Sequence, residues 1–189
     1  MPIPFNDIDE DSSDLGSAAF LKVDSSSDGA CSLGALLVMT ARGEPLEFAY
    51  NRVRVPQPFL WREDDLRRYV LRRLTTSLLS VCSQQPRILL YLDNEVHVPL
   101  FEQDLQLEVP IARVTAPAPG SRRTDTSTGE IIEDEEPGPT PAHVSWHPAP
   151  PEHGSVERGL FEHLSVHGLL LEPFERAEIG LREVYGPQS

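Results

Sequence analysis

Residues 21–38 read LKVDSSSDGACSLGALLV, and this stretch decides how the fold begins. An apolar run ends at Asp24, a polar segment containing Gly29 follows, and a second apolar run starts near Gly34. Apolar runs of this length, bounded by polar and glycine-containing segments, are typical of strands. The stretch therefore predicts two strands and raises a question. Asp24 is either the first residue of a turn or a carboxylate displayed at the end of a strand.

The pattern outward from this stretch predicts further strands and helices. Expected strands cover 18–23, 34–41, 46–55, 87–93, 105–114 and 143–147. Expected helices cover 61–82, 155–168 and 173–186. Pro110 lies within 105–114, and this favours a weak strand at the edge of the sheet. The order predicts an α/β (α+β) fold with one mixed sheet, which starts with a three-stranded antiparallel meander, continues through a helical crossover and is completed by C-terminal helices.

The helix expected over 61–82 has one apolar stripe along its length. The stripe recurs at spacings of three and four residues, as one face of a helix requires, and consists of Leu66, Val70, Leu74, Leu78 and Val81. Glu63 has the spacing to share this face, so we expect it to lie on the side that faces the sheet. We expect Leu66, Val70, Leu74 and Leu78 to pack on a sheet that contains Leu37, Phe48 and Leu90.

Charge is distributed unevenly along the 189 residues, whose net charge is −14. Acidic residues concentrate in 1–16 and in the proline-rich segment 115–140. Segments this polar bury too little surface to offset the entropy lost on ordering, so we expect both to be disordered. The folded domain is then expected to consist of 17–114, completed by 141–189. The negative charge favours solubility and disfavours non-specific binding to nucleic acid.

The cysteines and the apolar runs of the sequence indicate in which compartment the protein is expected. Cys31 and Cys82 are the only cysteines and form no CxxC motif, so neither a disulfide scaffold nor a zinc ribbon is predicted. The first residues contain no basic segment followed by an apolar one, and nowhere do 18 apolar residues run together. We expect a soluble, cytoplasmic protein that does not enter a membrane.

Three carboxylates stand at corresponding places in the expected elements: Asp24 in KVDSSSDG, Glu63 in WREDDLRR and Asp93 in LYLDN. Their order, together with the meander, helix and following strand, resembles the ribonuclease H-like fold. In that family an aspartate on the first strand, a glutamate on the first helix and an aspartate after the next strand hold two magnesium ions. The resemblance implies that Asp24, Glu63 and Asp93 are the metal-binding and catalytic residues of a nuclease.

The resemblance extends to the C-terminal part of the chain. The stretch VSWHPAPPEHGSVERG, residues 144–159, is similar to the family's last strand, its loop and its C-terminal helix. In the family a further acidic residue or a histidine lies near that helix. His147, His153 and Glu157 are the residues of this chain that the resemblance implies for that role.

Each of the three main carboxylates also has a purely structural interpretation. Asp24 can hold a backbone N–H in the turn that follows it, Glu63 complements the positive end of the helix, and Asp93 closes a strand. We favour the structural interpretation for Asp24. Like charges placed together would require a bound cation to offset their repulsion.

The other sequence patterns give weaker support for a binding or catalytic site. His163 and His167 have a spacing that a metal accepts on one helix face, but the glutamate of HExxH is absent. No glycine-rich loop has the spacing that cradles phosphates. Trp61 and Trp146 are suited to stacking on bases or to packing in the core, and we favour packing.

The sequence leaves two main functions open, and a third, regulation by nucleic-acid mimicry through the acidic segments, rests on charge alone. The first, which we favour, is a non-catalytic accessory or protein-interaction module of a soluble bacterial-type complex. It would engage a protein partner through its acidic tail or loop and would need no cofactor. The alternative is a metal-dependent nuclease of ribonuclease H-like type, with magnesium held by Asp24, Glu63 and Asp93. Their arrangement in space distinguishes the two.

Overall fold

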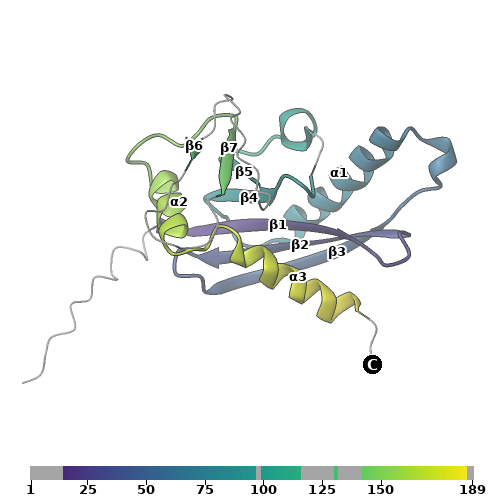
Figure 1. The fold of residues 1–189 in the computed structure, drawn as a ribbon, viewed down its shortest axis with the longest axis horizontal. Helices are drawn as coiled ribbons and strands as arrows, with labels where there is room; N and C mark the ends of the chain where they lie inside the picture. The colour runs from purple at the N-terminus through teal and green to yellow at the C-terminus, as the bar shows by residue number, and fades with distance from the viewer. Residues whose placement is uncertain (1–14, 97–98, 116–129, 132–141, 187–189) are drawn as a thin grey trace, which may run out of the picture.

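In the described part of the chain, seven strands form one mixed sheet in the order β3-β2-β1-β4-β5-β7-β6 (Figure 1). The computed structural model describes residues 15–96, 99–115, 130–131 and 142–186. The strands are β1 (Ser17–Ser25), β2 (Cys31–Thr40), β3 (Pro45–Arg54), β4 (Ile88–Leu92), β5 (Ile111–Thr115), β6 (Glu130–Ile131) and β7 (His143–His147). The α-helices are α1 (Glu63–Val81), α2 (Val156–Val166) and α3 (Glu172–Tyr185), and there are also a 3-10 helix (Pro58–Leu60) and a short π-helix (Leu100–Asp104). The predicted α/β fold with a mixed sheet is confirmed.

The sheet begins with the predicted antiparallel meander. β1 pairs with β2 from Ser17↔Thr40 to Ser25↔Ser32, and β2 then pairs with β3 in antiparallel fashion. Gly29 lies in the first turn and Gly43 in the second, both with positive φ, a conformation that costs glycine little because it has no Cβ. The turns that join these strands therefore have a local cause in the sequence.

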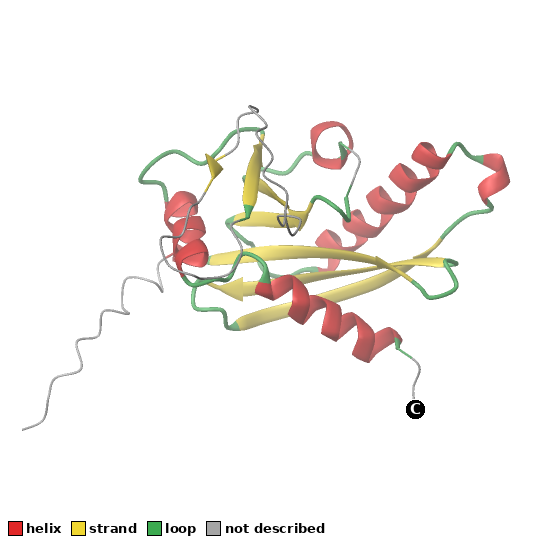
Figure 2. Cartoon of the chain, in the orientation of Figure 1, coloured by secondary structure: helices red, strands yellow, loops and turns green. Residues whose placement is uncertain are grey.

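α1 carries the chain from β3 back to the centre of the sheet, where β4 pairs with β1 in parallel (Figure 2). Leu21 of β1 lies opposite Tyr91 of β4, so the C-terminal ends of these two strands point to the same edge of the sheet. Acidic residues occupy the first turn of α1, which the helix dipole favours. α1 thus connects β3 to β4, which are separated in the sheet by β2 and β1, and this is the helical crossover that the sequence predicted.

One face of the sheet is covered by α1. Val70, Leu74 and Leu78 are buried against alternate residues of the strands, and these strand residues include Leu21, Leu36, Val38, Ala49, Val53 and Leu89. As predicted, α1 packs on the sheet that contains Leu37, Phe48 and Leu90, but the side chains of these three residues belong to its opposite face. Successive strand residues point to opposite faces, so a shift of one position exchanges the two surfaces.

The opposite face contains Leu37, Leu90 and Phe48 and is covered by α2 and α3. Phe20 of β1 packs edge-on against Phe174 of α3 in this layer. α2 begins after Ser155, whose hydroxyl accepts a hydrogen bond from the Arg158 N–H at 3.1 Å, as the predicted helix cap requires. Both C-terminal helices therefore pack on the sheet that contains the meander.

β5 is an internal strand and not the edge strand that Pro110 suggested. It begins at Ile111, directly after the proline, and lies between β4 and β7. The missing N–H of Pro110 therefore falls outside the strand, where it removes no ladder hydrogen bond. Val81, the last member of the predicted stripe, is also not core, because it ends α1 with 61% of its surface exposed.

Two further expectations concern segments that the structure covers only in small part. Of the segments expected to be disordered, 1–16 and 115–140, only residues 15–16, 115 and 130–131 are described. Leu15 is half-buried and packs against the α2–α3 side of the core. In the described part of the chain, no helix combines the length and the apolar character that a membrane crossing requires.

Candidate functional site

The C-terminal ends of β1 and β4 and the N-terminus of α1 meet at one edge of the sheet, which we call the carboxylate edge. Asp24 belongs to β1, and Asp93 follows directly after β4. Because these strands are parallel and Leu21 lies opposite Tyr91, both aspartates are carried to this edge. Glu63 is the first residue of α1. The backbone therefore brings the three predicted residues to one region of the molecule.

A hollow of about 540 Å³ opens at the carboxylate edge. Asp24 and Glu63 both line it, together with apolar residues of α1 such as Val70 and Leu71. Asp93 does not line it, although the next residue, Asn94, does. The hollow therefore unites two of the three carboxylates that the sequence predicted.

Three charged residues that the sequence did not predict also line the hollow: Lys22, Glu95 and Glu178. Lys22 Nζ donates a hydrogen bond to Glu95 Oε1 and lies 3.3 Å from Glu178 Oε2. The second oxygen of Glu95 accepts the Val23 N–H at 2.9 Å. The signal available in the sequence was a single lysine in the apolar run AAFLKV, since a charge at such a position needs a partner.

Burial and charge act in opposite directions on this cluster. Burial acts to lower the pKa of Lys22, but its hydrogen bonds to Glu95 and Glu178 and their negative charges together raise that pKa above its usual 10.5. Burial also raises the pKa of Glu95, against the effect of the hydrogen bonds that it accepts. We regard Lys22 and Glu95 as an ion pair near neutral pH, because the ammonium has two carboxylate partners.

Asp24 is a strand residue, contrary to the expectation that it begins a turn. It pairs with Leu33 across the β1–β2 ladder, and its Oδ1 accepts the Ser25 N–H at 2.7 Å. The turn starts at Ser26, and its carboxylate is supplied by Asp28, which accepts the Ala30 N–H at 2.9 Å. Asp24 does hold a neighbouring N–H, as predicted, but the turn does not depend on it.

Glu63 and Asp93 each form an ion pair with an arginine. The Glu63 side chain is 84% exposed and pairs loosely with Arg67, whose Nη2 lies 3.3 Å from Oε1. Glu63 therefore points mainly to solvent and not to the sheet-facing side that the helix pattern predicted. Asp93 Oδ1 lies 2.8 Å from Arg113 Nε of β5, so this carboxylate is directed along the sheet, away from the hollow.

The residues that the resemblance implied for the C-terminal part lie elsewhere. His147 pairs with Ile111 at the beginning of β5, and Glu157 lies 3.4 Å from Arg87, which precedes β4. Since β5 and β4 run parallel to β1, their beginnings lie at the edge opposite to Asp24. His147 and Glu157 therefore cannot join the other carboxylates, because the length of the sheet separates them.

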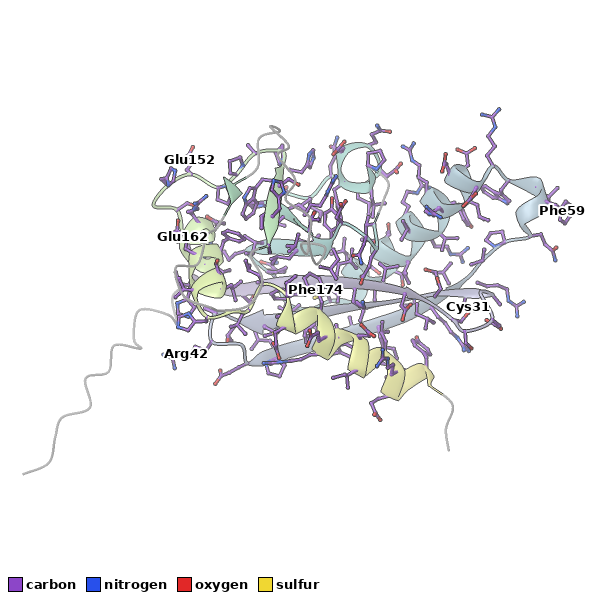
Figure 3. All side chains as sticks on the ribbon, viewed as in Figure 1. Cys31, Arg42, Phe59, Glu152, Glu162 and Phe174 are labelled. Carbon is purple, nitrogen blue, oxygen red and sulfur yellow. The ribbon has the colours of Figure 1, made fainter. Side chains whose placement is uncertain are left out.

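His153 follows Glu152 in the loop before α2. Figure 3 shows Glu152 at one end of the molecule and Cys31, at the start of β2 beside the end of β1, towards the other. His153 is therefore also distant from the carboxylate edge.

The remaining candidates are structural or exposed. The rings of His163 and His167 stack with their centroids 4.0 Å apart, and His167 Nδ1 lies 2.8 Å from the His163 carbonyl oxygen. Trp146 packs on Phe161 in the core. Trp61 lies against Tyr69 of α1 but stays 38% exposed. Phe59, which is also exposed, lies in the short 3-10 helix Pro58–Leu60 that precedes α1 (Figure 3).

The ribonuclease H-like resemblance implies a magnesium site, and the side chains at the carboxylate edge show how far they suit one. The donors at the carboxylate edge are carboxylate oxygens from three different elements, and hard oxygen donors are what magnesium prefers. Among the described residues, however, no three acidic, histidine or cysteine side chains are close enough to hold a metal. The carboxylate oxygens are of the kind that magnesium binds, but the side chains do not converge on one point. Asp93 is paired with Arg113, and Glu95 is paired with Lys22.

The chain resembles known proteins in its fold and not in its sequence. No family model matches the sequence, and no curated protein sequence does so either. Among solved structures, the chain is similar to Endonuclease V from Bacillus subtilis, with a TM-score of 0.58 and 15% identity over 92% of this chain and 82% of that one. For Endonuclease V from Streptomyces avermitilis the TM-score is 0.55 and the identity 13%, over 97% and 93% of the two chains.

The fold is ribonuclease H-like. The meander, the helical crossover and the parallel fourth strand agree with the resemblance that the sequence showed, and the likeness to the Endonuclease V structures extends over most of the chain. Identities of 13–15% establish the fold alone. Activity has to be argued from the carboxylate edge itself, because one fold supports many functions.

Proposed function

We propose that this protein is a metal-dependent nuclease of ribonuclease H-like type that acts through Asp24, Glu63 and Asp93. The observation that carries the proposal is that Asp24 and Glu63 line one hollow at the end of the first strand, with Asp93 delivered to the same edge by the parallel β4. The similarity to solved structures of Endonuclease V supports a nuclease over the non-catalytic module that the sequence favoured.

The chain's own residues suggest how a phosphodiester would be accommodated. Asp24 and Glu63 would hold magnesium, and Asp93 would join them after leaving Arg113. The ion would supply positive charge that stabilises the developing charge on the phosphoryl oxygens. Arg67 lines the hollow beside Glu63 and is half-exposed, so its guanidinium can bind a phosphate oxygen and hold the nucleic-acid backbone.

The non-catalytic module is the second candidate, and the ion pairs at the carboxylate edge favour it. Arg113 engages Asp93 at 2.8 Å, and Lys22 engages Glu95 and Glu178, so these carboxylates already have cationic partners. A protein of this kind would keep the fold without catalysis and would bind a protein partner. The acidic segments expected to provide that contact lie mostly outside the described residues.

Cleavage of labelled nucleic acid distinguishes these candidates. The full-length protein is incubated with an RNA–DNA hybrid and with single- and double-stranded DNA, with magnesium and with a chelator. Asp24→Asn and Glu63→Gln should each lower magnesium-dependent cleavage about hundredfold or more, the usual scale for losing a group that stabilises the transition state. Asp64→Asn is the matched control, because Asp64 neighbours Glu63 in the first turn of α1 but does not line the hollow.

Cleavage of at least one substrate that needs magnesium, is lost in both site variants and survives in Asp64→Asn supports the nuclease. Absence of cleavage on all three substrates, or cleavage that Asp24→Asn leaves unchanged, would assign the fold to the non-catalytic module instead.

A further inference from the structure

An exposed apolar segment lies directly before α1. Phe59, Leu60 and Trp61 follow one another in the chain, and their exposed fractions are 78%, 73% and 38%. Figure 3 shows Phe59 at one end of the molecule. Apolar side chains that are exposed next to one another and rimmed by polar ones mark a surface that binds a ligand or a partner. The segment is therefore a candidate binding surface.

A second hollow, of about 540 Å³, lies beside this segment, and we call it the arginine–aromatic hollow. Its lining includes the rings of Trp61 and Tyr69 and the guanidinium groups of Arg62, Arg68 and Arg72. Two aspartates also line it, so its charged side chains have a net charge of +1. The chain as a whole is strongly acidic, and this hollow therefore attracts an anionic ligand that the rest of the molecule repels.

Contacts within the protein hold part of this hollow in a fixed arrangement. Arg68 donates hydrogen bonds of 2.6 and 2.8 Å to the two carboxylate oxygens of Asp104, and this pair joins α1 to the short π-helix that ends at Asp104. The ring centroids of Trp61 and Tyr69 are 5.0 Å apart, and Arg73 Nη1 donates a hydrogen bond of 3.0 Å to the Tyr69 hydroxyl. A ligand that lies on these rings therefore loses little free energy to ordering the protein.

Arg62 and Arg72 stay available to a ligand. Both are exposed, and neither forms an ion pair within the part of the chain that the structure describes. Arg72 acts on Asp104 only through its charge, because both oxygens of that carboxylate already accept hydrogen bonds from Arg68. A free guanidinium group binds the oxygens of a phosphate well. Exposed aromatic rings beside free arginines are the combination that binds single-stranded nucleic acid, since bases stack on the rings and phosphates pair with the cations.

The arginine–aromatic hollow and the carboxylate edge lie on two sides of the same turns of α1. Glu63 and Arg67 line the hollow at the carboxylate edge, whereas Arg62 and Arg68 line the arginine–aromatic hollow. A helix with its side chains is about 10–12 Å wide. A strand whose phosphodiester lies at the carboxylate edge can therefore continue across the start of α1. Bases paired in a duplex are stacked on one another, so only an unpaired strand offers its base faces to the rings.

We propose that the arginine–aromatic hollow binds a single-stranded segment of nucleic acid that flanks the bond to be cut. Its bases stack on Trp61 and Tyr69, and its phosphates bind Arg62 and Arg72. This inference rests on the proposed nuclease function, because it makes the bound segment continuous with the phosphodiester at the carboxylate edge. It assigns the protein substrates that contain an unpaired stretch, in preference to a continuous duplex.

Binding of a labelled oligonucleotide, measured in a chelator so that no cleavage occurs, tests the proposal. The full-length protein is titrated against fluorescein-labelled oligothymidylate of about 20 nucleotides, longer than the roughly 4–16 that one single-strand-binding domain covers. Fluorescence anisotropy gives the affinity, and the same oligonucleotide annealed to its complement gives the affinity for duplex. The wild type should bind the single strand more tightly. Binding should also quench Trp61, whereas Trp146 packs on Phe161 in the core.

Two variants separate stacking from charge. Trp61→Ala should weaken binding at least about fivefold, because stacking of one base contributes about 1–3 kcal/mol and 1.4 kcal/mol is a tenfold change. Trp61→Phe keeps a ring and should bind nearly as tightly as the wild type. Arg72→Gln should lower the slope of log affinity against log salt, measured from roughly 50 to 200 mM, by about 0.7. Arg87→Gln is the matched control, because Arg87 is half-exposed at the opposite edge of the sheet, and it should leave the slope unchanged.

Each other outcome overturns the proposal. Absence of binding does so, as does duplex binding that equals single-strand binding, a slope that Arg72→Gln leaves unchanged, or an affinity that Trp61→Ala leaves unchanged. If Trp61→Ala fails to fold, as circular dichroism would show, quenching of Trp61 in the wild type takes its place, and absence of quenching then refutes stacking. A wild type that binds no oligonucleotide but forms dimers in sedimentation, which Arg72→Gln or Trp61→Phe weakens, would assign this surface to a second copy of the chain instead.

The outcomes also separate this proposal from the nuclease function. Binding that depends on Trp61 and Arg72, in a protein that cleaves no substrate with magnesium, supports this surface and refutes the nuclease. Magnesium-dependent cleavage that Asp24→Asn abolishes, in a protein whose binding is unchanged by Trp61→Ala and Arg72→Gln, supports the nuclease and refutes this surface.

Discussion

Leu74→Ala should lower the free energy of unfolding by about 3–5 kcal/mol, the upper part of the range for a buried leucine. Leu74 is 0% exposed, and it lies against β2 so closely that a Cβ added to Gly34 would come within 2.8 Å of Leu74 Cδ2. Truncation removes three carbon atoms, and their transfer to water costs about 2.4 kcal/mol at roughly 0.8 kcal/mol each. Because Gly34 has no side chain to fill the space, a cavity would remain and add to that cost.

Urea unfolding monitored by tryptophan fluorescence measures this change, and calorimetry should show a melting temperature roughly 6–20 °C lower, given about 2–4 °C per kcal/mol for a chain of this size. Val81→Ala is the matched control, because Val81 ends the same helix but is largely exposed. It should change stability by less than about 0.5 kcal/mol. A loss below about 1 kcal/mol for Leu74→Ala, with an unchanged urea dependence, would show that α1 does not cover this face of the sheet.

Two further predictions concern alkaline pH and the edge opposite to the hollow. Burial raises the pKa of Tyr91 to about 12, so the unfolded chain loses this proton first and stability should fall as pH rises from about 10 towards 12. In Tyr91→Phe, the fall in the free energy of unfolding between about pH 10 and 12 should be smaller by up to about 2–3 kcal/mol, as urea unfolding curves would show. If the free energy of unfolding depends on pH in the same way in both proteins, Tyr91 is not the group responsible. Glu157→Gln should leave magnesium-dependent cleavage within about twofold of the wild type, because Glu157 pairs with Arg87 at the far edge, and should cost at most about 1 kcal/mol of stability. A hundredfold loss of cleavage would show that the C-terminal helix does supply a catalytic group.

Local patterns in the sequence were sufficient for most of the secondary structure. The expected helix over 61–82 is α1, and the expected strand over 87–93 is β4. Ser155 caps α2 as predicted, and Pro173 stands in the first turn of α3. These features depend on hydrophobic period, capping and turn residues within a few positions, so a short window of sequence contains their cause.

The face on which α1 packs could not be decided in the same way. Leu36 and Leu37 are adjacent and equally apolar, yet one is buried under α1 and the other under the C-terminal helices. Both faces of this sheet are covered, so its strands lack the alternation of apolar and polar residues that would mark a core side.

For the candidate site, the sequence by itself determined which carboxylates stand at the ends of elements, because Asp24, Glu63 and Asp93 were located from the order of strands and the helix. Only the tertiary structure decided which of them share a hollow, that Asp93 is paired with Arg113, and that Lys22 is buried between Glu95 and Glu178. Lys22 and Glu95 are 73 positions apart in the chain. Electrostatic partners are set by distance in space, and that distance follows from the parallel pairing of β1 with β4 and from the docking of α3, neither of which leaves a local pattern in the sequence.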